Sequence, residues 1–158
     1  MIPLTAETQT LPPSPTVCAR DLMPEEQEPS RLRRWMREHL ARLELTSLAD
    51  DLTLIAGELA ANALVHGGTP ARVTMTVTRT ADGAGVVRLE FTDSGPGFDL
   101  ERVLRAGERG REEPAGHCDG RGLLIVAALS TRWGFRRTRA GHEVWAEQCF
   151  RPQPPDRP

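Results

Sequence analysis

The stretch LTLIAGELAANALVHGG, residues 52–68, decides the fold of this chain. Its apolar residues recur at helical spacing, and the glycine pair at its end is typical of a helix terminus. Glu58, Asn62 and His66 interrupt the apolar pattern at intervals of four residues. That spacing predicts that they lie along one side of the helix, about 6 Å from neighbour to neighbour. A narrow strip facing solvent would produce the same pattern. An amide oxygen, however, suits Mg²⁺, and a carboxylate one turn earlier could accept a proton.

The segments on either side of this helix predict a two-layer domain. An earlier helix begins at Ser30 as its N-cap, and Ser47 or Asp50 caps the helix quoted above. A third helix is apolar and covers residues 122–131. Alternating or short apolar runs predict an edge strand over 16–23, a hairpin over 71–80 and 86–92, and a closing hairpin over 132–138 and 143–150. The sum is an α+β two-layer sandwich, with three main helices on one face of a mixed, mainly antiparallel sheet.

Two glycine-containing segments join these elements. Asp93-Ser94-Gly95-Pro96-Gly97 directly follows a predicted strand, so it places a carboxylate at the strand end and lets the backbone approach a flat ring closely. The same letters also form an ordinary turn. Gly120-Arg121-Gly122-Leu123 opens the third helix, and a helix start presents free N–H groups to an anion. Each segment is a weak indication when it is taken singly.

In combination, the three segments carry a resemblance to a known family. ELAANALVHG is similar to the N box of the GHKL superfamily of ATP-binding domains, which have the Bergerat fold. DSGPGF resembles its first glycine box, and GRGLLIV resembles its second. Within the superfamily, NALVHG, GRGLLIVAALSTRWG and the terminal G-x-x-VWAE look like the bacterial anti-sigma-factor serine kinases. The resemblance covers residues 25–147.

The resemblance implies a role for individual residues. Glu58 would be the general base, and Asn62 would be a ligand of Mg²⁺. Residues 98–119 would form a lid over ATP, and its arginines Arg105, Arg109 and Arg111 are candidates to offset phosphate charge. The other nucleotide-binding residues would be Asp93 with Gly95 and Gly97 at the adenine, and Gly120, Arg121, Gly122 and Leu123 at the phosphates.

The resemblance also implies a function. The protein would transfer the γ-phosphate of ATP to a STAS-type anti-anti-sigma partner and bind a sigma factor, and relatives of this branch often form homodimers. An alternative is a nucleotide-gated switch with little or no kinase activity. A weaker alternative is the catalytic part of a histidine kinase with His39 as phosphoacceptor, but one predicted helix is too short for a dimerisation hairpin. Gly141-His142-Glu143-Val144-Trp145 departs from the Gly-Lys-Thr-Val-Trp of the branch, because it lacks a cation and adds a carboxylate.

The amino-acid composition further narrows the classes of function that this protein can have. All 20 basic residues are arginine, so lysine chemistry is excluded, and a net charge of −2 disfavours direct nucleic-acid binding. No apolar run approaches the roughly 20 residues that a membrane span requires, and the N-terminus lacks the pattern of a signal peptide. Three widely spaced cysteines do not predict a disulfide framework. We therefore expect a cytoplasmic protein with one ATP-binding domain over residues 16–150 and disordered, proline-bearing tails at 1–15 and 151–158.

Overall fold

Strands and helices follow one another in the order that the sequence predicts. The computed structural model describes residues 14–67, 70–96 and 121–152, without the side chains of residues 66, 67 and 121. A 3₁₀ turn, η1 (Thr46–Leu48), precedes α2, and a π-helical segment, η2 (Ala63–Gly67), follows it. The remaining elements are β1 (Thr16–Leu22), α1 (Glu28–Arg42), α2 (Ala49–Asn62), β2 (Ala71–Arg79), β3 (Gly85–Asp93), α4 (Arg121–Leu129), β4 (Arg132–Arg137) and β5 (His142–Phe150).

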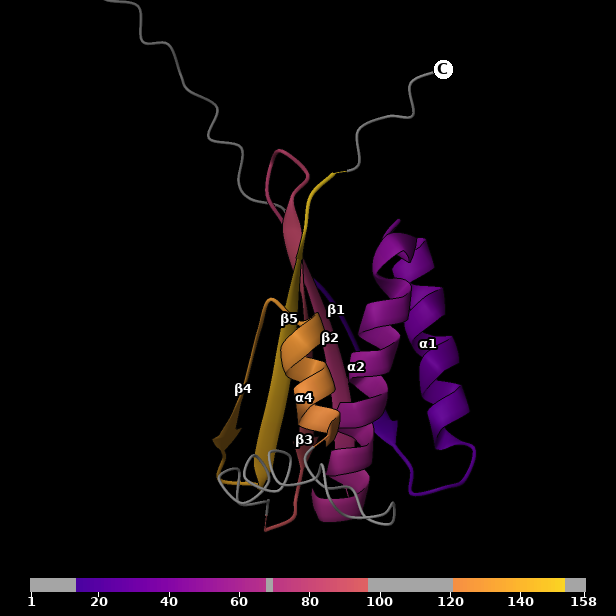
Figure 1. Cartoon of the computed structure of the whole chain (residues 1–158), viewed down its shortest axis with the longest axis vertical. Helices are drawn as coiled ribbons and strands as arrows, with labels where there is room; N and C mark the ends of the chain where they lie inside the picture. The colour runs from indigo at the N-terminus through magenta and orange to yellow at the C-terminus, as the bar shows by residue number, and fades with distance from the viewer. Residues whose placement is uncertain (1–13, 68–69, 97–120, 153–158) are drawn as a thin grey trace, which may run out of the picture.

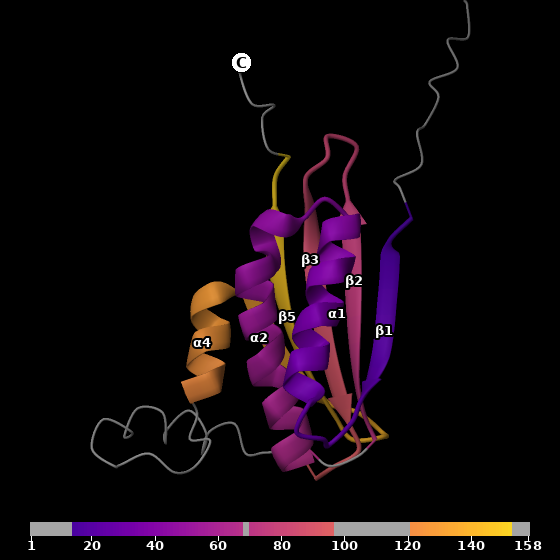
Figure 2. The same ribbon diagram turned by 90° about the vertical axis from the view of Figure 1, so that its right-hand side faces the viewer.

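The strands form one five-stranded sheet in the order β1-β2-β3-β5-β4. Every strand pair among the described residues is antiparallel. The three α-helices of the described residues lie on one face of this sheet, with α2 between α1 and α4 (Figures 1 and 2). The predicted two-layer α+β sandwich is confirmed, and β1 is the edge strand that residues 16–23 predict.

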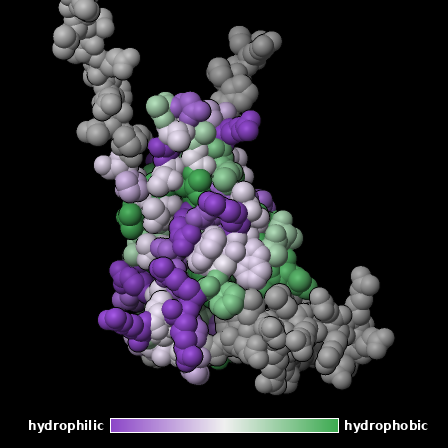
Figure 3. Space-filling view, turned by 90° about the vertical axis from the view of Figure 1, so that its left-hand side faces the viewer, coloured by the Kyte–Doolittle hydropathy of each residue, from purple (hydrophilic) through white to green (hydrophobic). Residues whose placement is uncertain are grey.

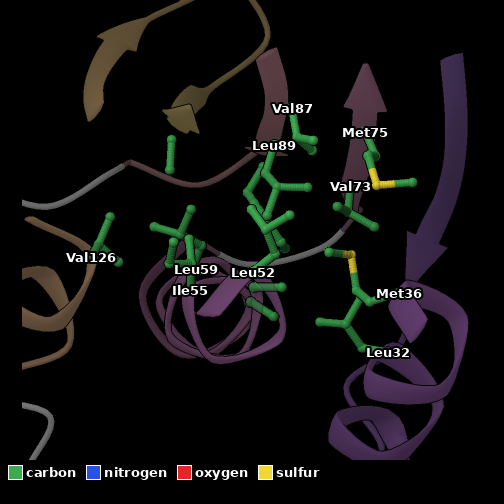
Figure 4. Packing of buried hydrophobic residues seen from close by; sticks show 14 of the residues in the cluster. Leu32, Met36, Leu52, Ile55, Leu59, Val73, Met75, Val87, Leu89 and Val126 are labelled. Atoms are coloured by element: carbon green, nitrogen blue, oxygen red, sulfur yellow. The ribbon is translucent and has the colours of Figure 1, made fainter. Parts of the chain in front are cut away.

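The core lies between the sheet and the helices, because every second residue of the central strands faces inward. On β3, for example, Val87, Leu89 and Phe91 are buried. Leu52 and Leu59 of α2 pack beside the sheet residues, between Val126 of α4 and Met36 of α1 (Figure 4). This packing fixes α2 against the sheet and thereby sets the position of its polar residues.

The helix starts differ from the sequence prediction. α1 begins at Glu28, two residues before Ser30, and Pro29 stands in its first turn, where proline costs no hydrogen bond. α2 begins at Ala49 after the 3₁₀ turn, so neither Ser47 nor Asp50 caps it, and neither helix has a side-chain cap. No helix in the described part of the chain is long and apolar enough to cross a membrane.

The other face of the sheet carries none of the described helices, and hydrophilic residues gather on part of this side of the molecule (Figure 3). Arg88 on β3 lies 2.8 Å from Glu147 on β5 and 2.9 Å from Glu90, and its guanidinium stacks over the ring of Trp145. Arg132 on β4 pairs with Glu147 at 2.7 Å. Pairs of opposite charge therefore join β3, β5 and β4 on this face.

Candidate functional site

Three element ends meet at one end of the molecule. The C-terminal end of α2, the end of β3 and the start of α4 all lie there (Figures 1 and 2). Each of the three polar segments from the sequence belongs to one of these ends. The fold therefore brings together groups that are up to about 60 positions apart in the chain.

Glu58 and Gly122 are in direct contact. A Cβ atom added to Gly122 would lie 2.5 Å from Oε2 of Glu58, so the carboxylate occupies the space that a side chain would fill. Glu58 is half-buried on α2, and Gly122 lies in the first turn of α4. The positive end of the α4 dipole and a carboxylate thus face each other. The sequence predicted a role for both residues, and the structure adds that they touch.

Asn62 is the last residue of α2 and is half-buried. It stands four residues after Glu58 in regular α-helix, so both side chains project from the same side of α2, as predicted. The backbone then becomes π-helical from Ala63 to Gly67. The side chain of His66, which the sequence also places on this side of the helix, lies outside the described residues. Such π segments often mark functional sites.

Asp93 ends β3 and is 9% exposed. Buried Val87, Leu89 and Phe91 precede it on the same face of the strand, so Asp93 also faces the helix layer. Its Oδ1 accepts a hydrogen bond of 2.9 Å from the backbone N–H of Gly95. No described residue donates a hydrogen bond to Oδ2 of Asp93. The turn after β3 is therefore organised by the carboxylate that the sequence singled out.

His142 lies beside this turn, a role that the sequence analysis did not assign. It is the register partner of Asp93 in the β3–β5 pair. Its Nδ1 lies 3.0 Å from the carbonyl oxygen of Gly95 and 4.0 Å from Oδ1 of Asp93. The sequence predicted two hairpins but no pairing between them, so it carried no signal for this contact.

Glu143, the carboxylate that departs from the anti-sigma-kinase pattern, takes no part in this site. Successive residues of a strand face opposite sides, and Glu143 faces the open side of the sheet. There it accepts a hydrogen bond of 2.8 Å from Arg136 and lies 3.8 Å from Arg88. The added negative charge is therefore neutralised on the far face.

The remaining predicted residues divide into two groups. Gly97, Gly120 and the lid over 98–119, including its arginines, lie outside the described residues. Arg121 begins α4, but its side chain is also outside them. Leu123 is 1% exposed and belongs to the core, so only its backbone could contact a ligand.

His39 belongs to the packed domain. It lies on α1, where its Nδ1 is 2.8 Å from the carbonyl oxygen of Trp35 and its ring contacts the Trp35 ring. α1 itself packs against α2 in the helix layer. This arrangement differs from the separate dimerisation hairpin that a histidine kinase places before its catalytic domain.

Known proteins resemble this chain in sequence family and in fold. Residues 23–147 match the family described as histidine kinase-like ATPase domain. No curated protein sequence matches the chain. Among solved structures, the RsbU and RsbW domains of Rv1364c from Mycobacterium tuberculosis align with a TM-score of 0.53 and 18% identity over 87% of this chain, which spans only 33% of that protein. The SiaB–SiaC complex from Pseudomonas aeruginosa aligns at 17% identity and a TM-score of 0.46, over 82% of this chain and 88% of that one.

Proposed function

The chain belongs to the family of histidine kinase-like ATPase domains, and from this premise we propose that it is a regulatory kinase. It binds ATP with Mg²⁺ and transfers the γ-phosphate to a serine or threonine of a STAS-type anti-anti-sigma protein, and it also binds a sigma factor. The observation that carries the proposal is the contact between Glu58 and the first turn of α4. A proton acceptor thus lies beside a helix start that can bind phosphates.

The start of α4 suits the phosphates of a nucleotide. Its first N–H groups have no partner within the helix, and they carry the positive end of the dipole. Gly122 leaves this turn without a Cβ, so a ligand and the Glu58 carboxylate can both approach the backbone. Because the chain contains no lysine, these amides and arginine side chains supply the positive charge.

Glu58 has the chemistry of a general base. A carboxylate beside bound phosphates can accept the proton of the attacking serine or threonine hydroxyl as the oxygen forms its bond to phosphorus. The Glu58 side chain is half-buried, and its Oε2 lies against the first turn of α4. The rest of catalysis in phosphoryl transfer is positioning and stabilisation of charge.

Asn62 fits a Mg²⁺ site that is shared with the phosphates of the nucleotide. Mg²⁺ prefers oxygen ligands, keeps several waters and takes the rest of its ligands from phosphates, so a single amide oxygen from the protein is sufficient. Glu58 and Asn62 stand one turn apart on α2, whose C-terminal end lies at the same end of the molecule as the start of α4 (Figure 1). When bound, the ion would neutralise phosphate charge.

The first test is calorimetric titration of the purified protein with ATP, with and without Mg²⁺. We expect Mg²⁺-dependent binding, and we expect Asn62→Ala to remove that dependence because the amide ligand is lost. Asp50→Asn on the exposed start of the same helix is the matched control and should bind as the wild type does. If the wild-type protein does not bind ATP, the whole proposal is wrong, because every part of it depends on ATP binding.

The second test separates transfer from binding. Glu58→Gln keeps the size of the side chain but removes the base, so ATP affinity should persist while the rate of phosphoprotein formation on a STAS-domain protein falls by about 10²–10⁴-fold. Phosphoserine and phosphothreonine are measured by mass spectrometry. Transfer at the wild-type rate in this variant would refute the role of Glu58.

The same two tests identify the alternative function. A protein that binds ATP, holds its partner with an affinity that differs between ATP and ADP, and yields no phosphoprotein would be a nucleotide-gated switch. If the protein binds ATP but transfers no phosphate, the proposed nucleotide site stands and the kinase activity is withdrawn in favour of the switch.

A further inference from the structure

We propose that His142 is a positioning residue for the adenine end of the nucleotide site, where it holds the turn that follows Asp93. This inference rests on the proposed binding of ATP, and it assigns a role to a residue at which the chain departs from the anti-sigma-kinase pattern. The juxtaposition that carries it is a histidine ring against the Asp93–Gly95 turn.

The direction of the hydrogen bond defines the state of the ring. The Gly95 carbonyl oxygen can only accept, so Nδ1 of His142 must carry the proton and donate across the 3.0 Å separation. The same residue, Gly95, donates its N–H to Oδ1 of Asp93. Gly95 is therefore held on both sides, by the carboxylate through its N–H and by the imidazole through its carbonyl.

The backbone around His142 makes this arrangement stiff. Gly141 has a φ of +151°, and a Cβ at that position would lie 1.8 Å from the carbonyl oxygen of Asp93. The tip of the β4–β5 hairpin thus packs directly on the strand end, and a bond from Thr138 N–H to the Gly141 carbonyl, 2.8 Å long, closes the tip. The His142 side chain is 14% exposed, so the ring has little freedom to leave.

The consequence concerns the two oxygens of Asp93. With Gly95 fixed, Oδ1 is committed to the turn, and the carboxylate plane is set by that bond. Oδ2 then has a fixed direction in which it can accept a hydrogen bond from the exocyclic amine of adenine. Without the imidazole, the turn can rotate and Asp93 loses its preset orientation. His142 would thereby determine how strongly the site distinguishes a base that has this amine from one that lacks it.

The experiment measures the affinity for two nucleotides by calorimetry. These are ATP and purine riboside triphosphate, which has the same sugar and phosphates but no exocyclic amine. In the wild-type protein we expect ATP to bind roughly tenfold or more tightly, as a hydrogen bond to a charged acceptor provides. In His142→Ala this preference should fall to about threefold or less, with the affinity for purine riboside triphosphate unchanged.

Two further variants separate positioning from general support of the fold. Asn places an amide N–H close to the position of Nδ1, so His142→Asn should restore the preference for ATP. His39→Ala removes a histidine whose Nδ1 also contacts a backbone carbonyl, 2.8 Å away on α1, and should leave the preference unchanged. Asp93→Ala alone should remove the preference for ATP over purine riboside triphosphate. The double variant with Asp93→Ala and His142→Ala should then show the same affinities as Asp93→Ala.

The proposal is overturned if His142→Ala keeps the wild-type preference for ATP. It is also overturned if His142→Ala lowers the affinity for both nucleotides equally and His142→Asn does not restore the affinity. If the wild-type protein binds neither nucleotide, the proposed function fails instead. Hydrogen exchange at the Gly95 amide then decides the role of His142. Faster exchange in His142→Ala that is reversed in His142→Asn supports the conclusion that His142 holds the turn after Asp93. Equal exchange in all three proteins refutes that conclusion.

Discussion

At the scale of single residues, two glycines on neighbouring helices have opposite surroundings. A Cβ at Gly122 would meet the end of the Glu58 side chain, whereas a Cβ at Gly57 would meet nothing within 4 Å. Glycine is usually explained by the freedom of its backbone. At Gly122 the explanation is instead the space that the missing side chain leaves for the Glu58 carboxylate.

Gly122→Ala should disturb the base without unfolding the protein. The contact that it creates is with a flexible side-chain end, which can move aside, so stability should change little. The displaced Glu58 should lower the rate of phosphotransfer about tenfold or more, within the range of general-base effects. In a Glu58→Gln background, Gly122→Ala should cost no further activity, and an additive loss would contradict the coupling.

Gly57→Ala is the control for this substitution, because it makes the same change in the interior of α2. It should raise the free energy of unfolding by up to about 1 kcal/mol through helix propensity and leave transfer unchanged. Urea denaturation measures the first quantity and the transfer assay the second.

At the scale of elements, a buried ion pair joins β1 to α1. Glu28 is 1% exposed, accepts a hydrogen bond of 2.6 Å from Arg20 on β1, and accepts another of 3.2 Å from the backbone N–H of Met23. The carboxylate of this first helical residue therefore bonds a group of the strand and a group of the connecting turn at once. Arg37 and Asp50 form a second pair, between α1 and α2, which is exposed.

The two pairs should differ sharply in their contribution to stability. Glu28→Ala leaves Arg20 and the Met23 N–H without their partner, so the free energy of unfolding should fall by about 3 kcal/mol. Asp50→Asn breaks the exposed pair and should change it by less than about 1 kcal/mol. Urea denaturation of both variants checks the contrast, and equal effects would show that burial does not govern these pairs.

At the scale of the whole molecule, ion pairs link neighbouring strands on the face of the sheet opposite the described helices. Burial alone would raise the pKa of the Glu147 carboxyl, but hydrogen bonds and charges from Arg88 and Arg132 outweigh it, so its pKa lies below the ordinary value. The pKa of Arg88 is raised by the reciprocal bonds to Glu147 and Glu90 despite the opposing effect of burial. This network of ion pairs crosses β3, β5 and β4.

The depressed pKa of Glu147 makes stability depend on pH. A carboxyl whose pKa is lower in the folded state binds fewer protons than in the unfolded state, so its contribution is present above the unfolded pKa of about 4.3. That contribution is lost as the pH falls through the lower folded value. Glu147→Gln should therefore be less stable than the wild type at neutral pH, with the two unfolding curves converging in acid. Glu44→Gln, an exposed glutamate without a described ion-pair partner, should show no such convergence.

The sequence alone determined the features that depend on local periodicity. Alternation on β2 and β3, the apolar spacing of α2 and the two glycine segments follow from side-chain direction within one element, so they predicted the sandwich and the positions of Glu58 and Asp93. The helix termini escaped prediction because neither α1 nor α2 has a side-chain cap. α1 ends at Arg42, and Glu44, just beyond its C-cap, has a φ of +58°, where a glycine would have been the recognisable signal.

Only the tertiary structure decided how the site is assembled. The π segment after Asn62, the carboxylate of Glu58 against Gly122, and the imidazole of His142 against Gly95 all depend on which elements pack together. His142 meets Asp93 because β5 pairs with β3 in one register, and a shift by one residue would turn its ring to the opposite face. Periodicity fixes the face on which a residue lies within its own element, whereas contact between elements is fixed by the packing of the core.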